Sequence, residues 1–187
     1  MIEVECKLPI ENTDNIKSKL TSLGFSLITK QKELDTYYDN SATFIRDNDS
    51  ALRIRTVTNL DTLASVSQIN FKGKKYDNVS MTRPEFETVV DNSEMMNKIL
   101  NSLGFYSVEP KVIKTRLVYK LDEMTACLDY VENLGDFLEL EIIVANESEK
   151  AAAMSKIEAT LKCIGYTISD TTTTSYLSAL QMLQKGD

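Results

Sequence analysis

Histidine is absent from the 187 residues of this chain. Its absence removes the side chain most often used as a general base and as a ligand of transition metals. A catalytic Ser-His-Asp triad is therefore excluded. The sequence also contains no Gly-x-x-x-x-Gly-Lys segment, so a P-loop does not account for any phosphate binding. Chemistry is left to carboxylates, lysines, tyrosines, cysteines, hydroxyls or a bound metal.

Cysteine is scarce as well. The three cysteines, Cys6, Cys127 and Cys163, form no CxxC pair, so we expect free thiols rather than a disulfide framework or a zinc site. No apolar run is long enough to span a bilayer, and residues 1–5 lack the charged-then-apolar layout of a signal peptide. The sequence therefore predicts a cytoplasmic protein that has no membrane partner.

What is present is typical of an ordinary globular protein. Hydrophobic residues make up 42% of the chain and charged residues 26%, and the length fits one domain over residues 1–187. The 21 basic and 28 acidic residues give a net charge of −7. This balance disfavours a nucleic-acid-binding surface, which needs a basic footprint, but it allows a local basic pocket.

Alternation of apolar and polar residues predicts strands, and apolar stripes at helical spacing predict helices. The expected strands are Ile2–Leu8, Leu34–Tyr38, Ala51–Val57, Ala64–Lys72, Met81–Val90, Val112–Lys120, Ala126–Val131 and Phe137–Val144. The expected helices are Thr13–Leu23, Ser93–Leu103, Glu147–Ile164 and Thr173–Gln184. Strands that follow one another in runs favour an antiparallel α+β fold.

A weak internal repeat suggests that the barrel is built from related halves. Glu-x-Glu strands at residues 3–5, 85–87 and 139–141 each precede a helix that ends in Gly plus an aromatic residue, at 24–25, 104–105 and 165–166. Glycine at that place is typical of a left-handed helix cap. Each repeat would bring a pair of carboxylates to a comparable position in the sheet.

The charged residues of these strands recur at i and i+2, so they share one face of the sheet. Such alternation is normal for an antiparallel sheet with one wet face. Two features favour another interpretation: the charged face has few Thr, Ser or Gln residues, and both signs of charge recur in pairs. The helices would cover the apolar face, which turns the charged face into the interior of a barrel of about eight strands, wide enough for a small ligand.

A charged interior is costly unless water, metal ions or an anionic ligand satisfy it. Carboxylates without His or Cys suit a hard cation such as Mg²⁺ or Mn²⁺. Arginine and lysine donate charge-assisted hydrogen bonds to phosphate oxygens. The residue types therefore predict binding of a polyphosphate together with a divalent metal.

The motifs resemble those of CYTH-domain proteins, the triphosphate tunnel metalloenzymes. Residues 3–7 resemble the family's ExExK signature, and the likeness continues in order through most of the chain. The other matching segments are residues 35–39, 51–55, 71–73, 83–87, 114–116, 128–131 and 134–141. The Leu-Gly-Asp-Phe segment and Ser175-Tyr176-Leu177 are most similar to the CyaB-type branch, which includes class IV adenylyl cyclases.

The resemblance implies an eight-stranded antiparallel tunnel with helices outside and metal-dependent action on ATP or another triphosphate. It implies metal-side carboxylates at Glu3, Glu5, Glu139, Glu141 and Asp129, with Glu85 and Glu87 in catalytic or supporting roles. It implies phosphate-binding cations at Lys7, Arg53, Arg55, Lys72, Lys114, Arg116 and Arg83. The sequence departs from the family at Lys74 and Lys75, where many members have proline after the glycine, and this puts the loop shape and contact with a nucleobase in doubt.

Three functions, two enzymatic and one non-catalytic, fit the same tunnel. A class IV cyclase would convert ATP into cyclic AMP and pyrophosphate. A triphosphatase would hydrolyse inorganic triphosphate, thiamine triphosphate or a nucleotide. A non-catalytic polyphosphate- or nucleotide-binding module is the third, but so many carboxylates would weaken anion binding unless they held metal. The preferred metal, the open end of the tunnel and the existence of a homodimer are left open.

Overall fold

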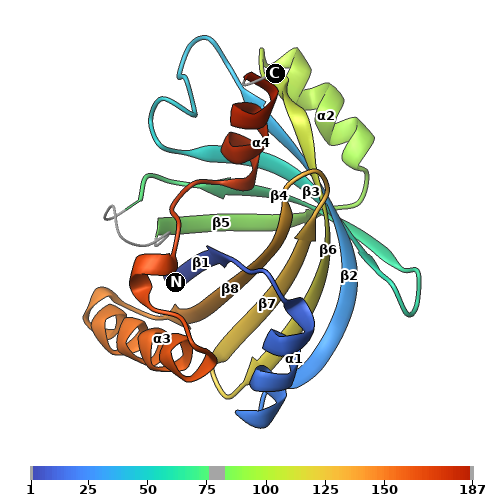
Figure 1. The fold of residues 1–187 in the computed structure, drawn as a ribbon. Coiled ribbons are helices and arrows are strands. Elements are labelled where there is room, and N and C mark those ends of the chain that lie inside the picture. The colour runs from blue at the N-terminus through green and yellow to red at the C-terminus, as the bar shows by residue number, and fades with distance from the viewer. Residues whose placement is uncertain (1, 76–82, 186–187) are drawn as a thin grey trace.

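A closed barrel forms the centre of the molecule. The structure is a computed structural model that describes residues 2–75 and 83–185. The described residues form an antiparallel sheet of eight strands that closes in the order β1-β5-β4-β3-β2-β6-β7-β8 (Figure 1). The strands are β1 (Ile2–Pro9), β2 (Ser26–Asp39), β3 (Ala51–Asn59), β4 (Ser65–Lys72), β5 (Arg83–Val90), β6 (Tyr106–Leu121), β7 (Met124–Val131) and β8 (Gly135–Val144). The predicted α+β barrel is confirmed.

Helices lie outside this barrel, as predicted. Among the described residues none is long and apolar enough to cross a membrane. The expected helices are all present, with ends that differ by a few residues. They are α1 (Thr13–Ser22), α2 (Ser93–Ser102), α3 (Lys150–Ile164) and α4 (Tyr176–Lys185), with short 3₁₀ turns at Glu147–Glu149 and Ile168–Asp170.

Two strands are much longer than their patterns predict. β2 begins at Ser26 rather than Leu34, and β6 begins at Tyr106 rather than Val112. β2 is bonded to β3 on one side and β6 on the other, so backbone hydrogen bonds continue it through a segment that has no apolar alternation. The predicted strand that starts at Met81 begins at Arg83 within the described residues, and residues 81–82 lie outside them.

The outward face of β1 and β8 carries the largest apolar core. Val4 and Leu140 are almost fully buried there, beneath Leu20 of α1 and Ile157 of α3. Burying one such side chain contributes about 1.5–3 kcal/mol. This core fixes the alternation of both strands, because a slip of one residue would bring their charged side chains into the apolar layer. The charged positions must therefore face the barrel interior.

The ends of α1 and α2 share one geometry. Gly24 and Gly104 have φ values of +97° and +87°, a left-handed conformation that favours glycine. The N–H of Phe25 then donates to the carbonyl of Leu20 at 3.0 Å, and Phe105 donates to Leu100 in the same way. These are the predicted helix caps, and they return the chain to the barrel as β2 and β6.

α4 lies across one end of the barrel (Figure 1). Its Leu177 and Leu180 pack on Val112, Val131 and Phe137. Each of these three residues lies two positions along its strand from a charged residue, so it shares the inward alternation. The interior therefore changes from charged to apolar at this end, and α4 covers the apolar part.

Candidate active site

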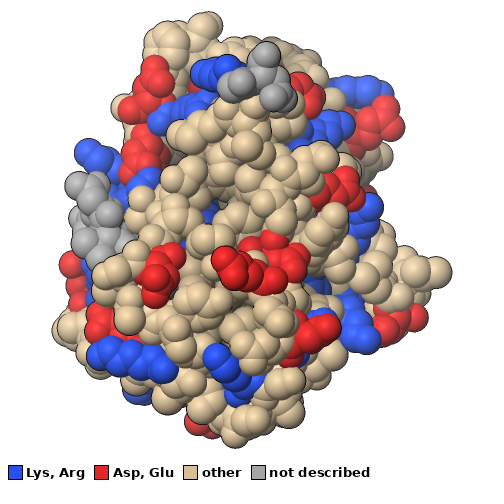
Figure 2. Space-filling model, viewed as in Figure 1, with Lys and Arg blue, Asp and Glu red and all other residues tan. Residues whose placement is uncertain are grey.

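The barrel encloses a cavity of about 920 Å³ to which every strand contributes side chains. In the view of Figure 2, the face of the molecule is mostly uncharged, and basic atoms are visible deep between the tan side chains near its centre. All but one of the residues predicted for the site line this cavity: Glu3, Glu5, Lys7, Arg53, Arg55, Lys72, Arg83, Glu85, Glu87, Lys114, Arg116, Glu139 and Glu141. Asp129 is buried just behind them. The roles given to these residues stay predictions, while their convergence is a fact of the structure.

One side of the cavity is a network of matched charges, which we call the paired wall. It lies on β2, β3, β6 and β7 and consists of Glu33, Asp35, Arg53, Arg55, Lys114, Arg116 and Asp129. Asp35 accepts two hydrogen bonds from Arg55, from Nε at 2.6 Å and from Nη2 at 2.7 Å, and Arg53 lies 3.2 Å away. Burial alone would raise the pKa of Asp35, but the two guanidinium groups hold it below its usual range.

Glu33 and Asp129 complete the paired wall. Glu33 Oε2 lies 2.9 Å from Arg55 and 3.2 Å from Lys114. Burial opposes its ionisation, yet Lys114, Arg116 and Arg55 together lower the pKa of Glu33 well below its usual range. Asp129 accepts from Lys114 Nζ at 2.8 Å and from Arg116 Nε at 2.6 Å. These contacts give Asp129 a supporting place behind the cations, and its predicted role as a metal ligand remains untested.

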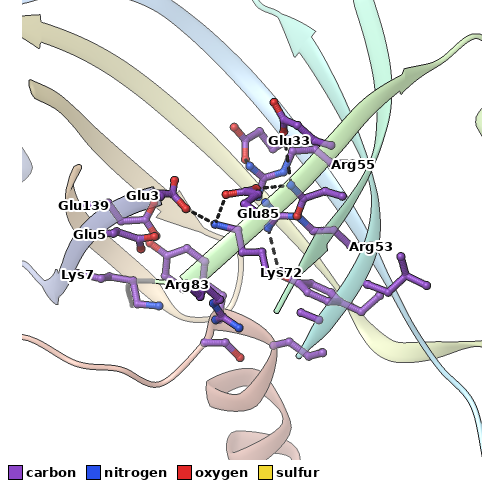
Figure 3. Close-up of a pocket in the computed structure, with 18 of the residues that line it drawn as sticks. Glu3, Glu5, Lys7, Glu33, Arg53, Arg55, Lys72, Arg83, Glu85 and Glu139 are labelled. Atoms are coloured by element: carbon purple, nitrogen blue, oxygen red, sulfur yellow. Dashed lines mark hydrogen bonds and ion pairs between the residues drawn. The ribbon is translucent and has the colours of Figure 1, made fainter. Parts of the chain in front are cut away.

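The opposite side, which we call the carboxylate wall, is rich in acid. It lies on β1, β5 and β8 and consists of Glu3, Glu5, Glu85, Glu87, Glu139 and Glu141. Figure 3 labels four of them, Glu3, Glu5, Glu85 and Glu139. Glu5 pairs directly with Glu141 across β1 and β8, an arrangement that is destabilising for like charges. Burial and then the nearby Glu139 raise the pKa of Glu5. The pKa of Glu5 therefore shifts in the opposite direction to that of Asp35. Glu139 differs from Glu5, because Arg116 of the paired wall forms an ion pair with it and holds its pKa below the usual range.

A lysine bridges part of the carboxylate wall. Lys72 Nζ lies 2.6 Å from Glu3 and 3.0 Å from Glu85, as the dashed lines of Figure 3 show. Burial nevertheless raises the pKa of Glu3 to about 9, because it outweighs the attraction of Lys72. For Glu85 the balance is reversed: burial opposes ionisation, but Lys72 and hydrogen bonds lower its pKa to about 2. Lys72 thus outweighs the effect of burial on the pKa of Glu85 but not on the pKa of Glu3.

Two buried cations have no carboxylate partner among the described residues. Lys7 is only 3% exposed and Arg83 6% exposed, and no Asp or Glu of the described chain lies within ion-pairing distance of either. Lys7 Nζ lies over the ring of Tyr176, 4.4 Å from its centroid. Arg83 donates a long hydrogen bond, 3.5 Å, to the carbonyl of Asp49, and its Nε has no partner. Both side chains line the cavity and are able to bind an anion.

The structure adds residues that were not assigned from the sequence. Glu33 belongs to the early part of β2, where the predicted strand was too short, and Asp35 lies within the predicted strand Leu34–Tyr38 but was given no role. Extending the alternation back from Tyr37 would have found them, since both lie at even spacing from it. Asn70 donates to Glu85 from the neighbouring strand. Tyr176 reaches the site from α4, and local spacing carries no signal for a contact that spans 47 residues.

The donor set fits a hard divalent cation. The carboxylate wall offers oxygen atoms without nitrogen or sulfur, as Mg²⁺ and Mn²⁺ prefer. A cation between Glu5 and Glu141 would also remove the repulsion between them. In the described part of the chain, no three acidic or thiol side chains are already close enough to hold a metal. The carboxylates therefore fit the ion in kind, and they would have to move together to bind it.

The order of the motifs and the geometry agree with one known family. The model of the CYTH domain matches residues 1–176. The chain belongs to the CYTH family. A candidate adenylate cyclase of Methanocaldococcus jannaschii is 35% identical over 177 residues, which cover 95% of this chain and 97% of that protein.

Solved structures show the same CYTH barrel. The PH1819 protein of Pyrococcus horikoshii OT3 superposes with a TM-score of 0.86 at 32% identity, over 98% of this chain and 99% of that one. HpAC1 from Hippeastrum, a candidate adenylyl cyclase with a dominant triphosphatase activity, has a TM-score of 0.65 at 20% identity, over 100% and 96% of the two chains. The second likeness concerns the fold alone.

The departure from the CYTH pattern lies after β4. Gly73 donates its N–H to the carbonyl of Pro84 at 2.9 Å, and a Cβ at this glycine would lie 2.9 Å from the proline ring. Lys75 forms an ion pair with Asp49 in the loop between β2 and β3. The chain after this glycine thus contacts the loop beside Arg83, and residues 76–82 lie outside the described ones.

Proposed function

We propose that this CYTH protein is a metal-dependent enzyme that acts on a nucleoside triphosphate, most like a class IV adenylyl cyclase that converts ATP into cyclic AMP and pyrophosphate. The observation that carries the proposal is the pair of buried cations, Lys7 and Arg83, that have no carboxylate partner within residues 2–75 and 83–185. Burial of an unpaired cation costs free energy. A polyphosphate would offset this cost with charge-assisted hydrogen bonds.

The size of the cavity and the relatives support a nucleotide. A volume of about 920 Å³ falls in the range of small-molecule sites. The Methanocaldococcus jannaschii relative, which is named as a candidate adenylate cyclase, shares 35% of its residues over nearly the full length. The loop residue Ile45 and the α4 residues Leu177 and Met182 line one end of the cavity beside the cations, and they offer apolar surface to the organic part of a substrate.

The two walls would have different roles, metal binding in the carboxylate wall and stabilisation of the phosphate charge in the paired wall. Glu5 and Glu141, with Glu3 and Glu139 beside them, would hold a divalent cation, which supplies positive charge to the phosphate oxygens while a phosphorus–oxygen bond breaks. Lys7, Arg83 and Arg53 would bind the phosphate chain directly. The remaining cations of the paired wall are fixed by Glu33, Asp35 and Asp129, so they present a preorganised positive field that needs no rearrangement during the reaction.

A triphosphatase is the second candidate. The observation that favours it is the clustering of the charged side chains in the middle of the barrel (Figure 3). A bare triphosphate could contact all of them without any contact to a base or sugar. Removal of the terminal phosphate from inorganic triphosphate, thiamine triphosphate or a nucleotide would use the same field, with water in place of the ribose 3′-hydroxyl.

Product analysis separates the two candidates. The protein is incubated with Mg²⁺ or Mn²⁺ and, in separate reactions, ATP, inorganic triphosphate and thiamine triphosphate. Cyclic AMP with an equal amount of pyrophosphate supports the cyclase, and orthophosphate supports the triphosphatase. Glu5→Gln should abolish either product, whereas Glu11→Gln, at an exposed position, should not. Absence of product from every substrate, together with unchanged metal binding in Glu5→Gln, would refute the enzymatic proposal.

A further inference from the structure

Tyr176 is placed where one aromatic ring meets two lysines of the cavity. It is the first residue of α4 and only 7% exposed. Lys7 Nζ lies 4.4 Å from its ring centroid, and Lys114 Nζ lies 5.2 Å from it. Both distances are within the range of a cation–π interaction. The hydroxyl group of Tyr176 donates to Asp129 Oδ2 at 3.0 Å.

The same C-terminal segment also holds the backbone of Lys7. The N–H of Thr172 donates to the carbonyl of Lys7 at 2.7 Å. The ring itself is fixed by Phe137, which meets it edge-on with centroids 5.0 Å apart and an interplanar angle of 67°. The segment from residue 172 to residue 176 therefore fixes Lys7 at both ends, at its carbonyl and at its ammonium group.

An aromatic partner differs from a carboxylate in what it leaves available. A carboxylate accepts N–H groups and would compete with phosphate oxygens for them. A ring face attracts the ammonium through its quadrupole and does not compete in this way. Lys114 gives one N–H to Asp129, at 2.8 Å, whereas Lys7 has no carboxylate within ion-pairing distance among the described residues.

We propose that Tyr176 is a positioning residue, whose ring holds the ammonium group of Lys7, and with it Lys114, toward the phosphate chain of the substrate. The inference rests on the proposed function, because it concerns the binding of a triphosphate in the same cavity. α4 is then part of the binding site as well as the cover of one end of the barrel. The ring provides this effect, and the hydrogen bond to Asp129 only orients the ring.

Two substitutions separate the ring from its hydroxyl group. Tyr176→Phe keeps the ring and removes the hydrogen bond, and Tyr176→Leu removes the ring. Tyr119→Leu is the matched control, because Tyr119 is 6% exposed in the apolar core outside the barrel. Dissociation constants for inorganic triphosphate are measured by titration calorimetry with the full chain. We expect Tyr176→Leu to weaken binding about tenfold or more, and Tyr176→Phe to weaken it by about threefold at most.

A double-mutant cycle shows whether the ring acts through Lys7. In a Lys7→Met background, Tyr176→Leu should weaken binding much less than in the wild type. The ε-methylene proton signals of Lys7 should also show an upfield ring-current shift in the wild type and in Tyr176→Phe, and lose it in Tyr176→Leu. Full additivity in the cycle, or the same Lys7 shift in all three proteins, would overturn the inference.

The outcomes distinguish this inference from the proposed function. If the wild type fails to bind triphosphate, the proposed function fails and the inference falls with it. If the wild type binds and Tyr176→Leu binds equally well, only the inference fails. Equal losses in Tyr176→Leu and Tyr119→Leu would show a general effect on the fold, and equal losses in the two Tyr176 variants would assign the effect to the hydroxyl group. Either result would also refute the role of the ring.

Discussion

The two walls of the barrel differ in how completely their buried carboxylates are paired with cations. In the paired wall each carboxylate touches at least one guanidinium or ammonium group, and Asp35 touches two. In the carboxylate wall Lys72 pairs with Glu3 and Glu85, and Arg116 pairs with Glu139. Glu5 and Glu141 lie opposite each other in the register of β1 and β8, and neither forms an ion pair among the described residues. Charge pairing is therefore complete in the paired wall and incomplete in the carboxylate wall.

This difference gives the two walls different properties: the paired wall is already oriented, and the carboxylate wall has capacity to bind a cation. A network whose charges satisfy one another is rigid and already oriented, so it can stabilise charge on a substrate without rearranging. A carboxylate whose pKa is raised by burial and by a neighbouring carboxylate, as that of Glu5 is, has free energy to gain from a cation. Under the proposed function, the side that binds phosphate would be fixed in advance, and the side that binds metal would gain its missing charge from the ion.

The largest expected effect is on turnover, from the carboxylate wall. Glu5→Gln removes one carboxylate of the proposed metal site and should lower the rate on the true substrate by on the order of 10³-fold, since metal charge stabilisation amounts to several kcal/mol. Steady-state kinetics with Mg²⁺ and Mn²⁺ measure it, and the exposed Glu11→Gln is the control. A variant that kept most of its rate would show that Glu5 does not hold the metal.

The next effect is on stability, from the paired wall. Asp35→Asn leaves Arg53 and Arg55 buried without their shared partner and should lower the free energy of unfolding by about 3–5 kcal/mol. Asp14→Asn, in an exposed pair with Lys17, should change it by about 1 kcal/mol or less. Urea denaturation without metal gives both values. In the same assay Glu5→Gln should be no less stable than the wild type, and a large loss there would remove the contrast between the walls.

A third prediction compares Lys7, which has no carboxylate partner in the part of the chain that the structure describes, with the paired cation Arg55. Lys7→Met should weaken triphosphate binding by about 10–100-fold, the equivalent of a charged hydrogen bond, and should leave the melting temperature unchanged or higher. Arg55→Met should weaken binding too, but it should also lower the melting temperature, because it leaves Asp35 and Glu33 short of a partner. Calorimetry and thermal unfolding separate the cases. A drop in melting temperature for Lys7→Met would mean that Lys7 is paired after all.

The smallest effect is a pH dependence of stability that has opposite signs for Glu5 in the carboxylate wall and Asp35 in the paired wall. The pKa of Glu5 is raised in the folded protein, so its contribution to stability is present below the unfolded pKa of about 4.3 and is lost as the pH rises toward the folded pKa. The pKa of Asp35 is lowered, so its contribution is present above about 3.9 and is lost as the pH falls.

Denaturation of the metal-free protein at a series of pH values tests this contrast. Each carboxylate contributes a slope of at most about 1.4 kcal/mol per pH unit. Glu5→Gln should remove part of the decline in stability above about pH 5, and Asp35→Asn should remove part of the decline in acid. If the two variants changed the same side of the profile, the assignment of opposite pKa shifts would be wrong.

Much of this arrangement was predictable from the sequence. Alternation alone places Glu3, Glu5 and Lys7 on one face, because successive strand residues point to opposite sides. The lack of histidine and of any CxxC pair favours oxygen atoms as the ligands of a metal. The burial of Val4 and Leu8 under α1 and α3 then decides which face is inside, and this could be argued from the apolar stripes of the helices.

The contacts between distant segments were not predictable. Glu33 was missed because backbone hydrogen bonds to β3 and β6, rather than an apolar pattern, continue β2 through it. Asp35 lay within the predicted strand, but its role depends on its contacts with Arg53 and Arg55 of the neighbouring strand. Tyr176 meets Asp129 across 47 residues, and no local spacing encodes that distance. Charge pairing depends on register as well. The sequence shows that the barrel holds both signs of charge, but only the pairing of strands shows which charges neutralise each other and which do not.

The closure of the barrel has a consequence for how the chain folds. β1, at residues 2–9, pairs only with β5 and β8 among the described strands, and β8 ends at Val144. During synthesis the edge of β1 that pairs with β8 must therefore stay unpaired until most of the chain has left the ribosome, and β5, which ends at Val90, pairs only with Ile2 and Glu3. Such distant pairing is typical of folding on a millisecond-to-second scale rather than in microseconds. The strand that carries the ExExK residues is thus one of the last to gain both neighbours, and its exposed edges make the nascent chain dependent on protection from aggregation until then.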